Sequence, residues 1–446
     1  MARTAIGAQA DGLSPDCGQA PRFVLACLGC KVNQAEAASL AAELMARGWR
    51  EAAEGEAPEV ALLMTCTVTA TAGRQSRQMA RRLIKAHPEA RVVVSGCDAQ
   101  AAPQAYRKEG ARVAGRADLA GLADLLAGGG QGPSQTGPLA APDAGPICPG
   151  ARLAGQGRTR GLLKVQDGCD AGCAYCIVPA VRGRPRSLPL AEAASAWLLL
   201  GQAGAAEVVL TGVHLGRWGG DLTPPLGLTD LLASLLATHP GPRLRLSSLE
   251  VSEVSDHLLA LMAGQPRLCP HLHVPLQTGS DRLLTGMGRP YTRAQYAQRL
   301  EAAARALPGL CLGADVMVGL PGESEADFAD TRALISSLPL AYLHVFPYSP
   351  RPGTPAAAMA GRVPGPLARA RAAELRALGQ AKRLAFHQAQ IGRQDLAVVE
   401  GEGLARTGNY CLARLDRRLP AGSLVEIESL AVEETSAGPL LVARVL

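Results

Sequence analysis

The sequence predicts an α/β fold in three parts: an N-terminal parallel α/β domain, a central partial barrel of six strand–helix units, and a small all-β barrel at the C-terminus. Short apolar runs alternate with segments of helical period up to about residue 128, and they do so again from residue 158 to residue 384. The tail from Asp395 to Leu446 instead holds short Val- and Leu-rich runs separated by Gly, Asn and Pro. We therefore expect domains at residues 21–128, 158–384 and 385–446.

The composition is that of a globular protein with two or three domains. Of 446 residues, 48% are hydrophobic and 19% are charged, while only 3% are aromatic, so aliphatic side chains must fill the cores. No signal peptide is apparent, and no apolar run approaches the ~20 residues of a membrane span. Twelve cysteines in such a chain predict a reducing, cytoplasmic setting without a membrane partner. The net charge of +6 suits an RNA partner without requiring one.

The N-terminal domain follows a lead, residues 1–20, that we expect to be disordered. Three strands are predicted in it, at Phe23 to Leu28, Val60 to Thr65 and Arg91 to Ser95. Each strand is followed at once by a cysteine; the three are Cys30, Cys66 and Cys97.

Because the carboxyl ends of parallel strands share one edge of a sheet, where ligands bind, these three thiols are expected to lie close together. Three thiols at this edge suggest an iron–sulfur cluster in which one iron is not bound by a cysteine. The alternative is three buried core cysteines, which are common. The glycines Gly29 and Gly96 beside the strand ends favour the cluster.

A helix predicted after Cys66 carries Arg74, Arg77 and Arg81 on one face, at positions i, i+3 and i+7. Such a stripe is usually a solvated face. Because this helix closely follows Cys66, contact with RNA phosphates is the alternative. Residues 129–157 are rich in Gly, Pro, Ala and Gln and have no periodicity, so they are predicted to be a linker.

Six strand-like runs alternate with helical segments in the central part, which predicts a partial (β/α)6 barrel with its active site at the C-terminal mouth. They are Leu162 to Gln166, Glu207 to Thr211, Arg243 to Ser247, His271 to Leu276, Cys311 to Val318 and Tyr342 to Phe346.

The loop after the first of these strands holds a CxxxCxxC motif, formed by Cys169, Cys173 and Cys176. Three thiolates from one short loop can converge on a four-iron cluster and leave one iron for a ligand other than protein. A structural zinc site or a disulfide framework are the alternatives. Zinc would need a fourth ligand, and the nearest histidine after the loop is His214, far along the chain. We interpret His214, His271 and His344 as packed or hydrogen-bonded histidines.

The CxxxCxxC loop resembles that of the radical S-adenosylmethionine enzymes. The runs LGCKVNQAE, TCTVTATA and SGCDAQ, which contain the three N-terminal cysteines, resemble the N-terminal domain of the methylthiotransferases within that group. The resemblance covers nearly the whole chain. It implies two 4Fe-4S clusters, one held by Cys169, Cys173 and Cys176 with S-adenosylmethionine on its open iron, and an auxiliary one held by Cys30, Cys66 and Cys97.

Later strand ends match the same family and imply a pocket for S-adenosylmethionine. Gly212 permits close approach of the backbone to a ligand, and Ser247 and Glu250 are suitable acceptors for ribose hydroxyls. The remaining cofactor residues that the resemblance implies come from two runs. His273 and Gln277 lie in a polar, glycine-bearing segment. Asp315, Gly319, Pro321 and Gly322 lie in the run GADVMVGLPGES, whose tight turn is expected beneath the adenine ring.

The tail resembles the TRAM domain, an RNA-binding module, with Arg406 and Arg414 among its expected phosphate contacts. Together these resemblances imply 2-methylthiolation of an adenosine at position 37 of tRNA. The partners implied are tRNA, a reduced flavodoxin or ferredoxin-type electron donor, and a sulfur donor.

The motifs CKVNQ, LTGVHLG and RPYT resemble the members that act on N6-threonylcarbamoyladenosine. Isopentenyladenosine in tRNA and an aspartate of a ribosomal protein are alternative substrates. A non-catalytic iron–sulfur protein that binds RNA is the alternative from another class.

Overall fold

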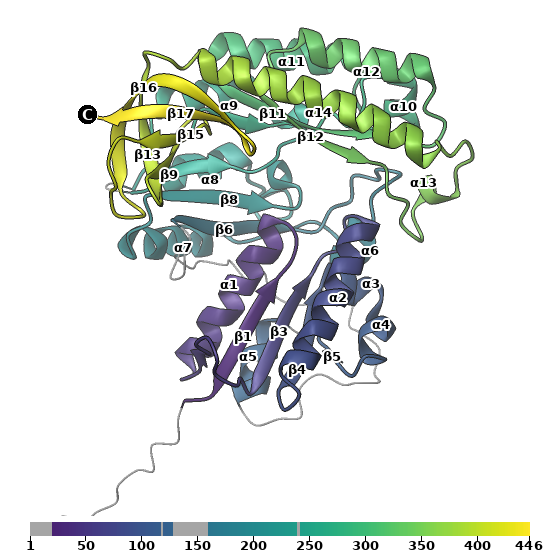
Figure 1. Cartoon of the computed structure of the whole chain (residues 1–446), viewed down its shortest axis with the longest axis vertical. Coiled ribbons are helices and arrows are strands. Elements are labelled where there is room, and N and C mark those ends of the chain that lie inside the picture. Colours follow the sequence, from purple (N-terminus) through teal and green to yellow (C-terminus); the bar gives the residue numbers. More distant parts are fainter. Residues whose placement is uncertain (1–19, 117–118, 128–158, 239–240) are drawn as a thin grey trace, which may run out of the picture.

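The computed structural model describes residues 20–116, 119–127, 159–238 and 241–446. Residues 1–19 of the predicted lead and the whole predicted linker lie outside the described residues. The described chain forms a lower N-terminal domain, an upper central domain and a C-terminal barrel beside the latter (Figure 1). Within these ranges, no helix is both long and apolar enough to cross a membrane.

The N-terminal domain is built on a five-stranded parallel sheet with the order β2-β1-β3-β4-β5. Its strands are β1 (Arg22–Cys27), β2 (Arg50–Glu51), β3 (Val60–Thr65), β4 (Arg91–Gly96) and β5 (Arg112–Val113). The three predicted strands are β1, β3 and β4; the other two have two residues each, too few for a periodic pattern.

Helices cover both faces of this sheet because successive residues of a buried strand point to opposite sides. Leu62 and Met64 of β3 pack in a core with α1 (Lys31–Ala46) and α5 (Leu119–Ala127). Ala61 and Leu63 face the other core, which contains residues of α2 (Ala70–Ala86), α3 (Cys97–Ala101) and α4 (Pro103–Arg107). With β3 buried along its whole length, the strand ends are the accessible part of the sheet.

The central domain is a partial barrel of six parallel strands, as predicted. They are β6 (Arg160–Asp167), β8 (Glu207–Gly212), β9 (Arg243–Leu246), β10 (His271–His273), β11 (Cys311–Val318) and β12 (Tyr342–Pro347). The short β7 (Arg186–Ser187) pairs antiparallel with β6. Two sheets, β7-β6-β8-β9 and β10-β11-β12, are joined by a bridge between Ser248 and His273.

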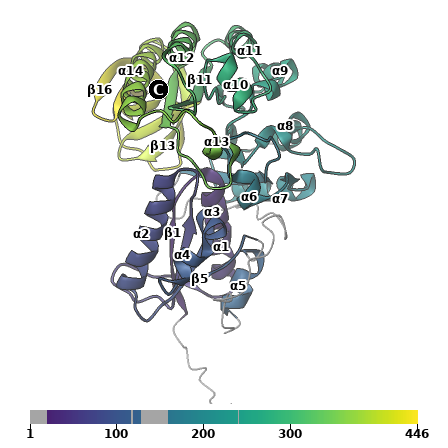
Figure 2. The same ribbon diagram turned by 90° about the vertical axis from the view of Figure 1, so that its right-hand side faces the viewer.

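The helices of the central domain are α6 (Val178–Arg182), α7 (Leu190–Gln202), α8 (Leu228–Leu236), α9 (Asp256–Gly264), α10 (Asp281–Gly286), α11 (Arg293–Ala306), α12 (Glu325–Ser337), α13 (Pro355–Ala358) and α14 (Gly365–Gln388), with short 3-10 turns at Leu215–Arg217 and Val251–Glu253. In Figure 2, α9, α11, α12 and α14 lie along the upper side of the molecule. The domain has one large, mostly aliphatic core, in which Trp197 and Trp218 are the largest side chains.

The C-terminal domain is a closed five-stranded barrel with the order β13-β14-β15-β17-β16, which confirms the predicted small all-β barrel. Its strands are β13 (Gln394–Gly401), β14 (Leu404–Thr407), β15 (Leu412–Leu415), β16 (Leu424–Thr435) and β17 (Gly438–Val445). Helix α14 leads into it and extends across the predicted domain boundary at residue 384.

Buried charges join this barrel to the central domain. Glu207 of β8 accepts from Arg243 Nε at 2.6 Å and Arg245 Nε at 2.8 Å. The Arg243 guanidinium donates onward to the carbonyls of Leu396 and Arg406, at 2.6 and 2.7 Å.

Candidate active site

The three N-terminal cysteines lie at one edge of the N-terminal sheet. Cys30 precedes α1, Cys66 follows β3 and Cys97 begins α3, and their strands β1, β3 and β4 are neighbours. Gly29 has φ +107°, and a Cβ there would lie 2.9 Å from the Cys66 sulfur. Only glycine therefore lets the loop that carries Cys30 approach Cys66 so closely.

These thiols differ in burial. Cys66 and Cys97 are 6% and 7% exposed, whereas Cys30 is exposed. Burial raises the pKa of Cys66 to about 11 and also raises the pKa of Cys97, although the Arg182 guanidinium acts in the opposite direction on Cys97. The buried thiols need a cation or a metal nearby before they can be thiolates.

The second set of cysteines lies in the loop between β6 and α6, at the mouth of the central barrel. His214 Nδ1 lies 3.5 Å from Cys169 Sγ, and Arg289 Nη1 donates to Cys173 Sγ at 3.3 Å. Burial raises the pKa of Cys176 to about 12. Burial alone would lower the pKa of His214, but its contacts with Cys169 and Glu253 raise it to about 10.

Neither set has the geometry of a disulfide or of a single zinc ion. All six cysteines are free thiols. Four zinc–sulfur bonds of ~2.3 Å in a tetrahedron place sulfurs about 3.8 Å apart. Across the described part of the chain, three ligand atoms approach within 4.8 Å of one another only at His273, Asp315 and His344. Neither set of three sulfurs is therefore drawn together as closely as a single zinc ion would require.

The histidine–aspartate group lies on the barrel strands and is held by its own hydrogen bonds. Asp315 Oδ1 lies 2.9 Å from His273 Nε2 and 3.2 Å from His344 Nδ1. The Tyr342 hydroxyl joins His273 Nδ1 to His271 Nε2, at 3.0 and 2.9 Å. His271, His273 and His344 are thus hydrogen-bonded histidines.

A cavity of about 560 Å³ lies beside the second set of cysteines. Its walls include Cys173, His214, Glu250, Glu253 and Arg289. This volume is within the usual range for a small-molecule site. Hydroxyls and an aromatic side chain complete the lining, from Thr229, Ser252, Ser255 and Tyr291.

The donor set of this region fits S-adenosylmethionine. Carboxylates suit its amino group and its ribose hydroxyls, and the Tyr291 ring supplies an apolar surface. The Ser247 hydroxyl, at the end of β9, is buried and has no hydrogen-bond partner in the described structure, so it is available to a ligand. Of the predicted cofactor residues, Glu250 lines this cavity.

The other predicted cofactor residues lie at the strand ends or on the barrel strands. A Cβ on Gly212 would lie 2.9 Å from Gln166 Cβ, and Gln277 has a positive φ of 69°. The turn that contains Gly319, Pro321 and Gly322 packs toward α14, where a Cβ on Gly319 would lie 2.8 Å from the Cβ of Ala368.

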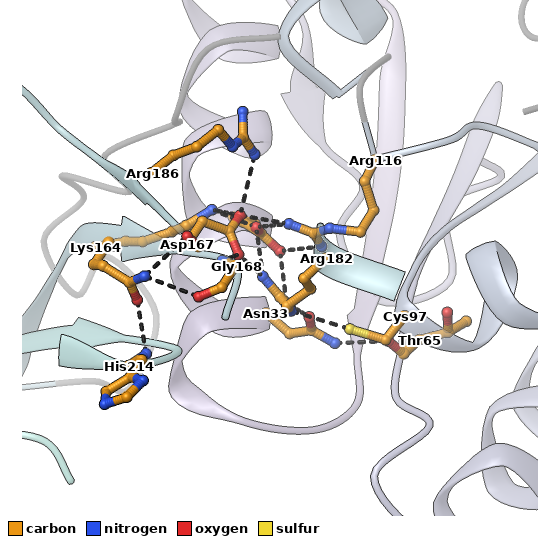
Figure 3. A network of polar contacts seen from close by, with 12 residues as sticks. Asn33, Thr65, Cys97, Arg116, Lys164, Asp167, Gly168, Arg182, Arg186 and His214 are labelled. Atoms are coloured by element: carbon orange, nitrogen blue, oxygen red, sulfur yellow. Dashed lines mark hydrogen bonds and ion pairs between the residues drawn. The ribbon is translucent and has the colours of Figure 1, made fainter. Parts of the chain in front are cut away.

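A buried network of charges connects the two sets of cysteines, and Figure 3 shows the part of it from Cys97 to His214. At its centre the carboxylates of Glu36 and Asp167 face the side chains of Arg116, Lys164 and Arg182, and all five are at most 3% exposed. Burial disfavours both carboxylate charges, but the three cations hold the pKa of each carboxyl well below its ordinary value.

The network reaches a cysteine at each end. Arg182 Nε donates to Cys97 Sγ at 3.2 Å, and Arg182 Nη1 donates to Asp167 at 2.8 Å. From Asp167 the contacts continue through Gly168 and Gln166 to His214, which lies against Cys169. Sequence reasoning missed this network. Its one local signal is that Lys164 and Asp167 interrupt the apolar run of β6.

The arginines predicted to contact RNA mostly have acidic partners. Arg77 pairs with Asp98 at 2.8 Å and Arg81 with Glu109 at 3.1 Å. In the C-terminal barrel, Arg406 pairs with Glu400 and Arg414 with Glu433, while Arg74 of α2 donates to the Thr71 hydroxyl. Phosphate would compete with these carboxylates for Arg77, Arg81, Arg406 and Arg414.

Comparisons with known proteins divide the chain along the same lines. A model described as the Radical SAM superfamily matches residues 163–335, and one described as the uncharacterized protein family UPF0004 matches residues 22–115. Among solved structures, the radical S-adenosylmethionine methyltransferase TsrM of Kitasatospora setae is similar in fold, with a TM-score of 0.57 and 16% identity over 76% of this chain and 77% of that one.

Two curated relatives are similar over almost their whole length. The threonylcarbamoyladenosine tRNA methylthiotransferase MtaB of Rickettsia prowazekii is 34% identical, over 91% of this chain and 94% of the relative. The tRNA-2-methylthio-N(6)-dimethylallyladenosine synthase of Erythrobacter litoralis is 31% identical, over 93% of this chain and 96% of the relative.

Proposed function

We propose that this chain, which belongs to the tRNA methylthiotransferases of the radical SAM superfamily, adds a methylthio group to N6-threonylcarbamoyladenosine in tRNA. Membership of that superfamily implies one 4Fe-4S cluster and S-adenosylmethionine. Our proposal adds the second cluster, the cysteines that bind it and the identity of the modified nucleoside.

One observation carries the proposal: two sets of three cysteines lie at the strand ends of two adjoining domains and are connected by a buried polar network. A single radical cluster would need only the set in the central barrel. Insertion of sulfur needs a second site that holds the sulfur close to the radical site, and Cys30, Cys66 and Cys97 supply three thiols at the adjoining sheet edge.

In this proposal the residues of the chain bind and orient the reacting groups. Cys169, Cys173 and Cys176 hold the radical cluster, which with S-adenosylmethionine supplies the one-electron chemistry needed at an unreactive C–H bond. Ser247 and Glu250 contact the nucleoside part of S-adenosylmethionine. Cys30, Cys66 and Cys97 hold the auxiliary cluster at which the sulfur is kept.

A reduced flavodoxin or ferredoxin-type protein supplies the electrons in this proposal, and a separate sulfur donor replenishes the sulfur. The tRNA enters where the two domains meet, and the C-terminal barrel lies beside the central domain as a further RNA contact. Relatives named for either adenosine derivative are similar to this chain, so the nucleoside itself is the most direct readout.

Nucleoside mass spectrometry of total tRNA tests the proposal. Cells that lack the protein should lose 2-methylthio-N6-threonylcarbamoyladenosine and regain it with the wild type, but not with Cys97→Ala or Cys173→Ala. Cys27→Ala is the matched control, because Cys27 ends β1 and packs against the core, three positions before Cys30.

If the cells lose the 2-methylthio derivative of isopentenyladenosine instead, the substrate in the proposal is wrong and the type of reaction is unchanged. If no methylthio nucleoside changes, the proposal is wrong, and mass analysis of ribosomal proteins would then test the aspartate alternative. Rescue by Cys97→Ala but not by Cys173→Ala would remove the N-terminal set from the proposal.

A further inference from the structure

Arg182 joins the buried charge network to an N-terminal cysteine through a hydrogen bond. Its side chain is 2% exposed and comes from α6, directly after the CxxxCxxC loop. Nε donates to Cys97 Sγ at 3.2 Å, Nη1 to Asp167 at 2.8 Å and Nη2 to Asn33 Oδ1 at 2.6 Å. One guanidinium of the central domain thus faces a sulfur of the N-terminal domain.

Asn33 extends this contact to the other two cysteines. Its amide nitrogen donates to the carbonyls of Leu28 and Thr65, at 3.0 and 2.7 Å. Leu28 and Thr65 lie two residues and one residue before Cys30 and Cys66. Arg182 therefore orients Asn33, and Asn33 ties together the two loops that carry Cys30 and Cys66.

Among the described residues of the network, the buried cations outnumber the buried carboxylates. Three buried cations, Arg116, Lys164 and Arg182, face two buried carboxylates, Glu36 and Asp167. A buried cation without a counter-charge is strongly unfavourable. Of the three cations, Arg182 lies beside Cys97, where a negatively charged cluster would offset the excess positive charge.

We propose that Arg182 is a positioning residue of the auxiliary cluster, fixing the sulfur of Cys97 through its Nε donor and keeping the reduction potential of that cluster higher than its sulfur ligands alone would set it. This inference rests on the auxiliary cluster of the proposed function. Reduction adds negative charge to the cluster, so a buried cation and an N–H donor on a sulfur ligand favour the reduced form.

The test uses the full chain with Cys169, Cys173 and Cys176 all replaced by alanine, so that only the auxiliary cluster can form. Reconstitution should give about four iron atoms per chain. In this background, Arg182→Gln removes both the charge and the arginine donor. In an EPR-monitored redox titration, the ratio of reduced to oxidised cluster at a fixed solution potential should fall at least tenfold, which is 59 mV for one electron.

Two variants separate the contact with sulfur from the charge of the network. Arg182→Lys keeps the charge and should change the ratio less than threefold. Arg116→Gln removes an equally buried cation of the same network that has no hydrogen bond to Cys97, and it should shift the ratio less than Arg182→Gln. A shift with Arg182→Gln that is no larger than the shift with Arg116→Gln would overturn the proposal.

A second measurement does not depend on the folding of any Arg182 variant. In protein labelled with 15N-arginine, pulsed EPR of the reduced auxiliary cluster should detect coupling to an arginine nitrogen, because Nε lies 3.2 Å from Cys97 Sγ. Absence of that coupling would overturn the proposed role of Arg182 but not the auxiliary cluster. A triple variant that binds no iron overturns the auxiliary cluster itself and this inference with it.

Discussion

Replacing Glu36 by glutamine should loosen the contact between the N-terminal domain and the central barrel. The Glu36 carboxylate is 2% exposed and lies 2.5 Å from both Arg116 and Lys164 and 3.2 Å from Arg182. Glutamine has almost the same shape, but it carries no charge and turns an N–H group toward the cations. The substitution therefore changes the electrostatics of the network and little else.

The loss of stability depends on the ion pairs that remain after Glu36 is replaced. Breaking a buried ion pair by removing one partner costs ~3–5 kcal/mol. Asp167 stays within 2.8 Å of all three cations, so the lower end of that range applies. We expect a loss of about 3 kcal/mol in the free energy of separating the domains, which is on the order of a 100-fold change in the opening equilibrium.

Hydrogen exchange is the suitable assay because a chain of several domains need not unfold in one step. Amides of α1 and β6 should exchange on the order of 100 times faster in Glu36→Gln than in the wild type. The control is Glu43→Gln, the same chemical change at a partly exposed position on the same helix. An acceleration below about tenfold, or one that the control matches, would refute the assignment of the network as the link between the domains.

Two further predictions concern pH and the C-terminal barrel. Because the pKa of Glu36 is lowered from 4.5 in the folded chain, its stabilisation is complete well above pH 4.5 and is lost as pH falls below that value, so the fall in melting temperature between pH 5 and pH 3 should be smaller in Glu36→Gln than in the wild type. Arg243→Met leaves two carbonyls of the C-terminal barrel without their donor and should cost about 3 kcal/mol, seen as faster proteolytic release of residues 394–446. The exposed pair of Arg444 is the control, and Arg444→Met should cost less than about 1 kcal/mol. Equal release from both arginine variants would contradict the predicted role of Arg243.

Much of the fold could be predicted because strands and helices each produce a periodic pattern of apolar residues along the sequence. The six barrel strands, the three long N-terminal strands and the C-terminal β domain all follow from such local patterns. The two-residue strands β2 and β5 left no pattern to find. The carboxyl-edge rule for parallel sheets also placed Cys30, Cys66 and Cys97 together, since it needs only the positions of three strand ends.

The sequence by itself determined the longer strands, the order of the domains and the two cysteine sets, because each follows from local patterns and from the positions of the strand ends. Only the tertiary structure decided which charges surround those cysteines. Glu36 and Lys164 are separated by 128 positions and Arg182 and Cys97 by 85. Such pairs have no period or spacing in the sequence, because their partners are chosen by the packing of one domain against another and by the high free-energy cost of a buried charge without a counter-charge.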